Sequence, residues 1–181
     1  MPHITLLFPK LLYSEDLNIS DVYNNEIKQE IVKILADEDN SVPTSVTNYF
    51  SSKNITEDIL KNPVFAPLFA MIRENIRSFC KEVKFNRELQ IQDVWLSITH
   101  PGKYHNIHKH PNVTLAGVYY VESEPSTNLE FICDNKFGVE DHTEKLNSKK
   151  LLLFDGSLVH GFTHVSMKEP KITIAFNCNP C

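Results

Sequence analysis

The first half of the chain repeats apolar residues with the period of an α-helix. Within the segment 27–35, apolar side chains recur three to four residues apart with charged residues between them, which predicts an amphipathic helix that ends before Pro43. A second helical stretch begins near Thr56. It leads into a longer helix whose apolar face consists of Leu68, Ile72, Ile76 and Phe79. We expect these faces to pack on a sheet.

From about Glu88 the apolar period changes to two, and β-branched and aromatic residues dominate. The polar segment 134–149 is interpreted as a long loop. Many short strands at close spacing predict a β-sandwich or jelly roll. The candidate strands are 89–99, 104–110, 114–122, 128–133, 150–154, 161–166 and 171–178.

Histidines concentrate in the strand-rich half. Seven of the eight lie between His100 and His164, and His108 and His110 are spaced so that a strand would point both to one face. A third ligand from His160 would close one side of a metal site and leave positions for substrate or oxygen. Non-haem Fe(II) enzymes use this arrangement with two histidines and one carboxylate, and here a third histidine stands in the carboxylate's usual place.

The last two predicted strands suggest a pocket wall. If they form a hairpin that turns near 167–170, then His160 lies opposite Asn177, and alternate residues of the final strand share the histidine's face. These residues are Lys171, Thr173, Ala175 and Asn177. A water-exposed strand shows the same alternation, but its alignment with His160 favours a cavity lined by small residues and a few polar groups.

Length and charge narrow the class of protein. A chain of 181 residues predicts one domain, and a net charge of −5 with a pI near 5.9 makes duplex nucleic acid an improbable partner. The sequence has no run of about 18 apolar residues, so we expect no membrane span. Its opening residues lack the features of a signal peptide, and a cytoplasmic location is expected.

The cysteines are few and irregularly placed. Cys178 and Cys181 have C-x-x-C spacing, which is compatible with zinc or a redox disulfide, but they stand at the end of the chain with no second pair. We therefore expect all four cysteines to be reduced thiols.

Three ordered blocks of sequence resemble a known family. The block 102–112 reads G-K-Y-H-N-I-H-K-H-P-N, the block 116–121 reads A-G-V-Y-Y-V, and the block 171–177 reads K-I-T-I-A-F-N after His160-Gly161. They are similar to the H-x-H-P-N and S-G-V-Y-Y signatures and the closing strand of a family of 2-oxoglutarate/Fe(II)-dependent oxygenases. The motifs lie between residues 95 and 177.

The resemblance implies a fold and two cofactors. The fold is mostly β with α: a double-stranded β-helix (a jelly roll) over residues 88–181, flanked by helices in the N-terminal portion 1–87, in the single domain 1–181. The cofactors are Fe(II) and the co-substrate 2-oxoglutarate. The expected product is a hydroxylated substrate, either a protein side chain or a small molecule.

The resemblance also assigns residues. The iron ligands carry over onto His108 and His160, with His110 where relatives more often have a carboxylate, and the arginine that binds 2-oxoglutarate falls on Lys171. Thr173 could add a hydroxyl donor. Residues expected beside the site are Tyr104, His105, His164 and Asn177.

His110 in place of a carboxylate and Lys171 in place of arginine are two departures from the family pattern, and they leave alternatives open. If His110 is not a ligand, Asp155 or Glu130 could supply a carboxylate. A third histidine also suits a cupin-like metalloenzyme that does not use 2-oxoglutarate, and a non-catalytic jelly-roll binding module is a third reading. The helical half could offer a homodimer face.

Overall fold

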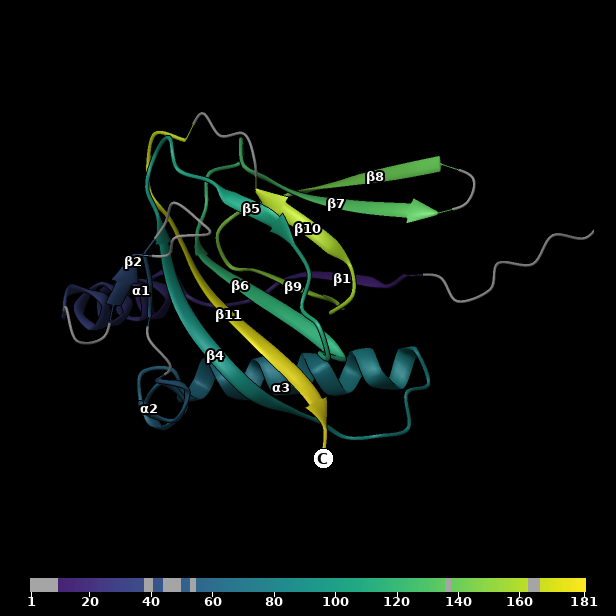
Figure 1. Cartoon of the computed structure of the whole chain (residues 1–181). Coiled ribbons are helices and arrows are strands. Elements are labelled where there is room, and N and C mark those ends of the chain that lie inside the picture. The colour runs from purple at the N-terminus through teal and green to yellow at the C-terminus, as the bar shows by residue number, and fades with distance from the viewer. Residues whose placement is uncertain (1–9, 38–40, 44–49, 53–54, 136–137, 163–166) are drawn as a thin grey trace, which may run out of the picture.

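The computed structural model describes residues 10–37, 41–43, 50–52, 55–135, 138–162 and 167–181 (Figure 1). Three helices and eleven strands follow one another along these segments. The helices are α1 (Asp21–Ala36), α2 (Thr56–Lys61) and α3 (Ala66–Glu82). The first strands are β1 (Leu12–Asp16), β2 (Ser41–Pro43), β3 (Phe50–Ser52), β4 (Leu89–Thr99), β5 (His105–His108) and β6 (Leu115–Glu122). The remaining strands are β7 (Asn128–Asn135), β8 (Gly138–Lys145), β9 (Lys150–Asp155), β10 (Val159–Phe162) and β11 (Lys171–Pro180).

The strands form two antiparallel sheets. The larger sheet has the order β1-β9-β6-β11-β4-β3-β2, and the smaller has the order β5-β10-β7-β8. Side chains from both sheets line one cavity, so the sheets face each other. This is the jelly-roll arrangement that the short strands predict.

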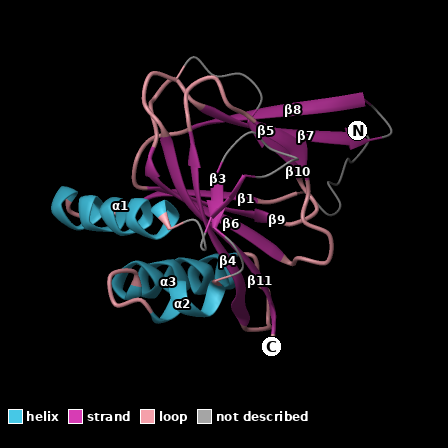
Figure 2. Ribbon diagram, turned by 60° about the vertical axis from the view of Figure 1, so that its left-hand side comes forward, coloured by secondary structure: helices cyan, strands magenta, loops and turns pink. Residues whose placement is uncertain are grey.

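The helices cover the outer face of the larger sheet, and Figure 2 shows them together on one side of the strands. Ile27 and Ile31 of α1 and Ile72 of α3 are fully buried in one cluster with Ile174 and Phe176 of β11. Since odd-numbered residues of β11 face the other way, one strand serves the hydrophobic core on one side and the cavity on the other.

Both long amphipathic helices are confirmed, as is the change to strands near residue 88. The loop predicted over 134–149 is wrong, because its polar residues form most of β8, which pairs with β7 along its whole length. Residues 141–143 and Lys145 of β8 are exposed, so this edge strand needs no apolar alternation and the pattern gave no signal. The N-terminal portion also contributes β1, β2 and β3 to the larger sheet.

The predicted closing hairpin is also wrong. β10 pairs with β5 and β7 in the smaller sheet, whereas β11 pairs with β4 and β6 in the larger one. The two strands therefore face each other across the cavity. No described helix is long and apolar enough to span a bilayer.

Candidate metal centre

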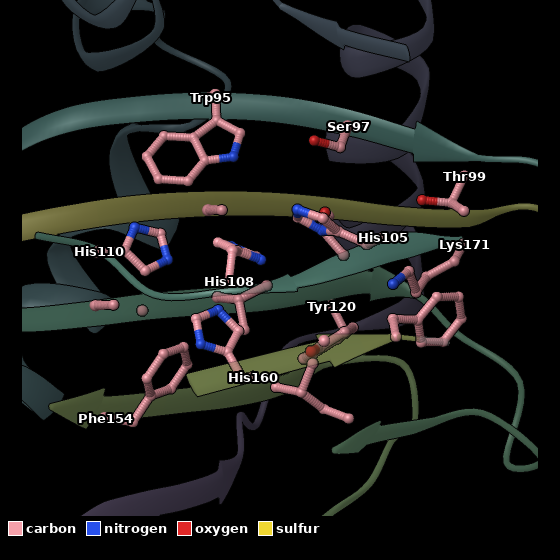
Figure 3. Close-up of a pocket in the computed structure, with 18 residues that line it drawn as sticks. Trp95, Ser97, Thr99, His105, His108, His110, Tyr120, Phe154, His160 and Lys171 are labelled. Atoms are coloured by element: carbon pink, nitrogen blue, oxygen red, sulfur yellow. The ribbon is translucent and has the colours of Figure 1, made fainter. Parts of the chain in front are cut away.

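The cavity between the sheets has a volume of about 60 Å³, enough for several water molecules (Figure 3). Every residue predicted to bind iron or 2-oxoglutarate lines it. Strands of the larger sheet supply one wall, and β5, β7 and β10 of the smaller sheet supply the other. The polar lining residues are Ser97, Thr99, His105, His108, His110, Tyr120, His160, Lys171 and Thr173. The remaining lining residues are apolar or glycine, with Trp95 and Phe154 beside the histidines.

Strand pairing brings the first two histidines together. His108, at the end of β5, is the direct register partner of His160 on β10, and their ring centroids lie 4.4 Å apart. Gly161 makes this pairing possible, because a Cβ there would stand 2.9 Å from the Cα of Ile107 on β5. The His-Gly pair of the sequence therefore combines a ligand with the close approach of the neighbouring strand.

Backbone carbonyls orient both of these rings. The Nδ1 of His108 lies 2.8 Å from the carbonyl oxygen of Asn106, and the Nδ1 of His160 lies 2.9 Å from that of Leu158. A carbonyl oxygen only accepts, so each Nδ1 donates its proton, and each Nε2 keeps a free lone pair. This is how metal-binding histidines are usually fixed.

His110 lies beside these two rings but is positioned by different contacts. It lies beyond the end of β5, and its backbone N–H donates to the carbonyl oxygen of Gly156 at 2.8 Å. Its ring is stacked between Trp95 (centroids 5.9 Å apart) and His160 (5.2 Å, interplanar angle 6°). Neighbouring side chains thus hold His110, rather than the regular strand that the sequence analysis assumed.

The three imidazoles form a group suited to one metal ion. One nitrogen from each of His108, His110 and His160 lies within 4.8 Å of the other two. Burial lowers the pKa of His160 to about 3 and that of His110 to about 4, so both rings are neutral at physiological pH and available as ligands. Neither Asp155 nor Glu130 joins a metal-binding group among the described residues. Asp155 instead accepts hydrogen bonds from Lys10 and Ser157.

A buried ammonium group stands at the other end of the cavity. Lys171 is 6% exposed, and its Nζ lies 3.4 Å from the centroid of the Phe162 ring. In the described part of the chain it forms no salt bridge with a carboxylate. Burial lowers its pKa to about 7. An isolated buried cation is costly, so this arrangement favours a bound anion.

Hydroxyl groups surround this ammonium group on the larger sheet. Lys171 is the register partner of Thr99 on β4, and Thr173 is the partner of Ser97. All three hydroxyl-bearing residues line the cavity, so the end that holds Lys171 has several hydrogen-bond donors for an anion.

Of the other residues predicted beside the site, one lines the cavity and two lie outside it. His105 lines the cavity and is stacked on His108 at 4.4 Å, and burial lowers its pKa to about 2. Tyr104 is 42% exposed and does not line the cavity. Asn177 also lies outside the cavity, and its Nδ2 donates to Oδ2 of Asp93 at 3.4 Å. Neither residue lines the cavity, which ends before these positions, so their roles beside the site stay predictions. His164 lies outside the described residues.

Several lining residues were not assigned from the sequence. Trp95, Ser97 and Thr99 occupy alternate positions of β4 and face the cavity together. Their period of two was a usable signal, since it matches the alternation of Lys171, Thr173 and Ala175 on the neighbouring strand.

Solved structures of low sequence identity share this architecture. A prolyl-4-hydroxylase from Pseudomonas putida has a TM-score of 0.70 at 8% identity, covering 94% of this chain and 92% of that one. The fold is the double-stranded β-helix. HygX from Streptomyces hygroscopicus, solved with nickel, 2-oxoglutarate and hygromycin B, has a TM-score of 0.64 at 11% identity, covering 93% of this chain and 82% of that one.

A third structure extends the comparison to a peptide complex. A prolyl hydroxylase from Trichoplax adhaerens, in complex with a peptide fragment of a hypoxia-inducible factor, has a TM-score of 0.67 at 11% identity, with coverages of 92% and 83%. No protein-family model matches the chain, and a search of the curated proteins found no significant match. The double-stranded β-helix is thus shown by structure.

Proposed function

We propose that the protein is a 2-oxoglutarate- and Fe(II)-dependent oxygenase that hydroxylates a protein side chain or a small molecule. One observation supports this most directly: three converging imidazoles and a buried lysine, which has no carboxylate partner among the described residues, lie in one cavity of a double-stranded β-helix. A metal and a dicarboxylate would occupy its two ends. The structural neighbours include HygX, solved with 2-oxoglutarate, and prolyl hydroxylases.

The donor set fits the metal. Neutral imidazole nitrogens suit Fe(II), and three protein ligands leave open positions for a chelating keto acid and dioxygen. Bound iron would supply the activation of dioxygen, with oxidative decarboxylation of 2-oxoglutarate to succinate as the accompanying reaction. His108, His110 and His160 would hold the ion. The metal centre would then carry a charge one unit more positive than a site with a carboxylate ligand.

Lys171 and Thr173 would hold the co-substrate. A carboxylate beside Lys171 offsets the desolvation of its ammonium group and raises its pKa, so the lysine is charged in the complex. Thr173 can donate its hydroxyl to the same group. Lysine lacks the planar fork of the arginine usual in the family, so the contact is one point charge rather than a paired hydrogen bond.

The remaining lining residues position these groups and exclude water. Trp95 fixes the ring of His110 by stacking, and Phe154 packs edge-on against His160 at 4.6 Å. Apolar walls lower the local dielectric constant, which strengthens the pairing of Lys171 with an anion.

Anaerobic titration with Fe(II) and 2-oxoglutarate tests the proposal. Chelation of iron by the keto acid gives a visible metal-to-ligand charge-transfer band, which we expect with the full chain and not with succinate in place of 2-oxoglutarate. Absence of the band in protein that binds iron would contradict the use of 2-oxoglutarate.

The third histidine favours a second candidate. A cupin-like metalloenzyme with a three-histidine site would bind the metal without the charge-transfer band. A non-catalytic jelly-roll module would bind no metal at all, so the same titration separates the three functions.

A further inference from the structure

The first residues of β4 leave one strand edge open. β11 pairs with β4 along one side, whereas β3 pairs with the other side only at Ser97 and Ile98. At Val94 the hydroxyl of Thr56 occupies that second side, within 3.0 Å of the backbone nitrogen and 3.3 Å of the carbonyl oxygen. Over 89–93 no described strand pairs with this second side, so among the described residues the backbone groups of this edge are open to another chain. A register shift in the pairing with β11 leaves Gln92 without a partner residue within this stretch.

A large groove follows this edge on the side away from the metal centre. Its volume is about 580 Å³, and α3, the connection 83–88 and the start of β4 enclose it. Leu89, Gln90 and Ile91 all line it. Consecutive strand residues point to opposite faces, so contact with all three places the groove at the edge and the beginning of the strand. No residue of β11 lines it, which places it on the unpaired edge.

The groove combines an apolar floor with a cationic rim. Ile76, Phe85 and Leu89 contribute to the floor, and the basic residues that line it are Arg73, Arg77, Lys81 and Arg87. The three basic residues of α3 are spaced four apart and so stand in one row along the helix. Like charges at this spacing repel each other, and the whole chain is acidic with a net charge of −5.

Most of this positive charge is not neutralised by the residues that the structure describes. Glu74 pairs with Arg77 at 2.6 Å, and Glu88 also lines the groove. Arg73 lies over the Phe69 ring at 5.9 Å. Among the described residues, Arg73, Lys81 and Arg87 form no salt bridge.

The row and the edge have matching lengths. The eight steps along the helix from Arg73 to Lys81 rise about 12 Å, and the five strand residues 89–93, of which 89–91 line the groove, span about 13 Å. We propose that this groove binds an extended acidic segment of a partner protein. The segment would add a strand to the open edge of β4, direct alternate carboxylates towards the α3 row and place an apolar side chain on the floor. This site is independent of the metal centre.

The test uses the full chain without metal or keto acid, and an N-terminally labelled octapeptide of alternating Glu and Val. Fluorescence anisotropy should show binding that weakens with salt, and amide NMR shifts should concentrate at 89–93 and α3. The triple variant R73Q/R77Q/K81Q should lose affinity at least tenfold. The matched control K33Q/K61Q/K168Q, which removes three exposed lysines elsewhere, should bind as wild type does.

Two further probes separate the parts of the proposal. The same peptide with alternate backbone amides N-methylated keeps its charges but cannot form a strand ladder, so it should not bind. Equal binding of the N-methylated peptide would overturn strand addition, and equal loss in both triple variants would overturn the cationic row. Tighter binding of an eight-nucleotide oligouridine would assign the groove to nucleic acid instead. If no probe binds, the groove is not a peptide-binding site, and the basic residues serve only to protect the strand edge from pairing.

Discussion

At the residue scale, burial determines the chemistry of the cavity. It lowers the pKa of His110 to about 4 and of Lys171 to about 7, because transfer from water disfavours the charged form. The imidazole of His110 therefore stays neutral, which is the form that binds a metal. A bound anion would raise the pKa of Lys171 again, so the lysine would take up a proton on binding. The same physical cause prepares one end of the cavity for a cation and the other for a carboxylate.

The first prediction concerns the histidines. His108→Ala or His160→Ala should abolish stoichiometric Fe(II) binding, since backbone hydrogen bonds to Nδ1 fix both rings and leave each Nε2 free for the metal. His110→Ala should weaken binding, and His110→Asp should retain or tighten it by restoring a carboxylate. Isothermal titration under anaerobic conditions measures all four affinities.

His142→Ala serves as the control, because its side chain is 60% exposed on β8. Iron binding of wild-type strength in His110→Ala would show that His110 is only a neighbour of the metal.

The second prediction concerns the co-substrate. Lys171→Met should leave Fe(II) binding nearly intact and raise the 2-oxoglutarate dissociation constant at least tenfold, equivalent to about 1.4 kcal/mol. The reason is the loss of a charge-assisted contact in a buried site. Calorimetry with iron-loaded protein measures both constants, and unchanged keto-acid affinity would remove Lys171 from the site.

The third prediction concerns stability and pH. The folded-state pKa of Lys171 is lowered to about 7 from 10.5, so between these values the unfolded chain binds more protons. The contribution of Lys171 to the free energy of unfolding should therefore rise with pH across that range. Urea unfolding of wild type and Lys171→Met at pH 7 and pH 9.5 gives this contribution as a difference.

Without ligand, Lys171→Met should be the more stable protein at pH 7, by about 1–4 kcal/mol, and its advantage should shrink at pH 9.5. An advantage that grows with pH would mean that the lysine is not deprotonated by burial.

At the element scale, the close pairing of β5 and β10 sets the geometry of the metal centre. Each strand contains only four residues, and the register shifts between His160 and Phe162. Such short strands stabilise little by themselves, so their positions depend on close packing at Gly161.

The fourth prediction follows from that packing. Gly161→Ala should weaken Fe(II) binding, because the new Cβ would stand 2.9 Å from the Cα and 3.0 Å from the backbone nitrogen of Ile107. Adding Ile107→Ala removes the side-chain contact at 2.8 Å but not the backbone ones, so the double variant should remain defective. Full recovery of iron affinity in the double variant would place the clash in the side chain.

At the scale of the whole molecule, the proposed ligands would join the two sheets. The metal would be held by residues on and beside the smaller sheet, whereas Lys171 and Thr173 belong to the larger one. A keto acid bound to both would therefore connect the two sheets across the cavity.

The fifth prediction is that metal and 2-oxoglutarate stabilise the protein together by more than the sum of each alone. A ligand at one hundred times its dissociation constant adds about 2.7 kcal/mol to the free energy of unfolding. Thermal unfolding with each ligand and with both measures the excess, which Lys171→Met should lose. Strictly additive shifts would show that the two ligands bind independently.

Local patterns in the sequence determined much of this protein. The periods of 3.6 and two located both long helices and most strands, because side-chain direction repeats with backbone geometry. Spacing alone also placed Lys171, Thr173 and Ala175 on one face, and the order of the histidines indicated His108, His110 and His160. These properties depend on neighbours within a few residues.

Only the tertiary structure decided which strands pair and where the cavity ends. The β10 and β11 strands are consecutive in sequence yet belong to different sheets, because the pairing of a strand is set by competition among all strands rather than by its own residues. His110 is held by Trp95 and Gly156, which are distant in sequence, and Asn177 lies at a register shift beyond the cavity. Contacts between distant segments depend on the packing of the whole chain, so local periodicity could not predict them.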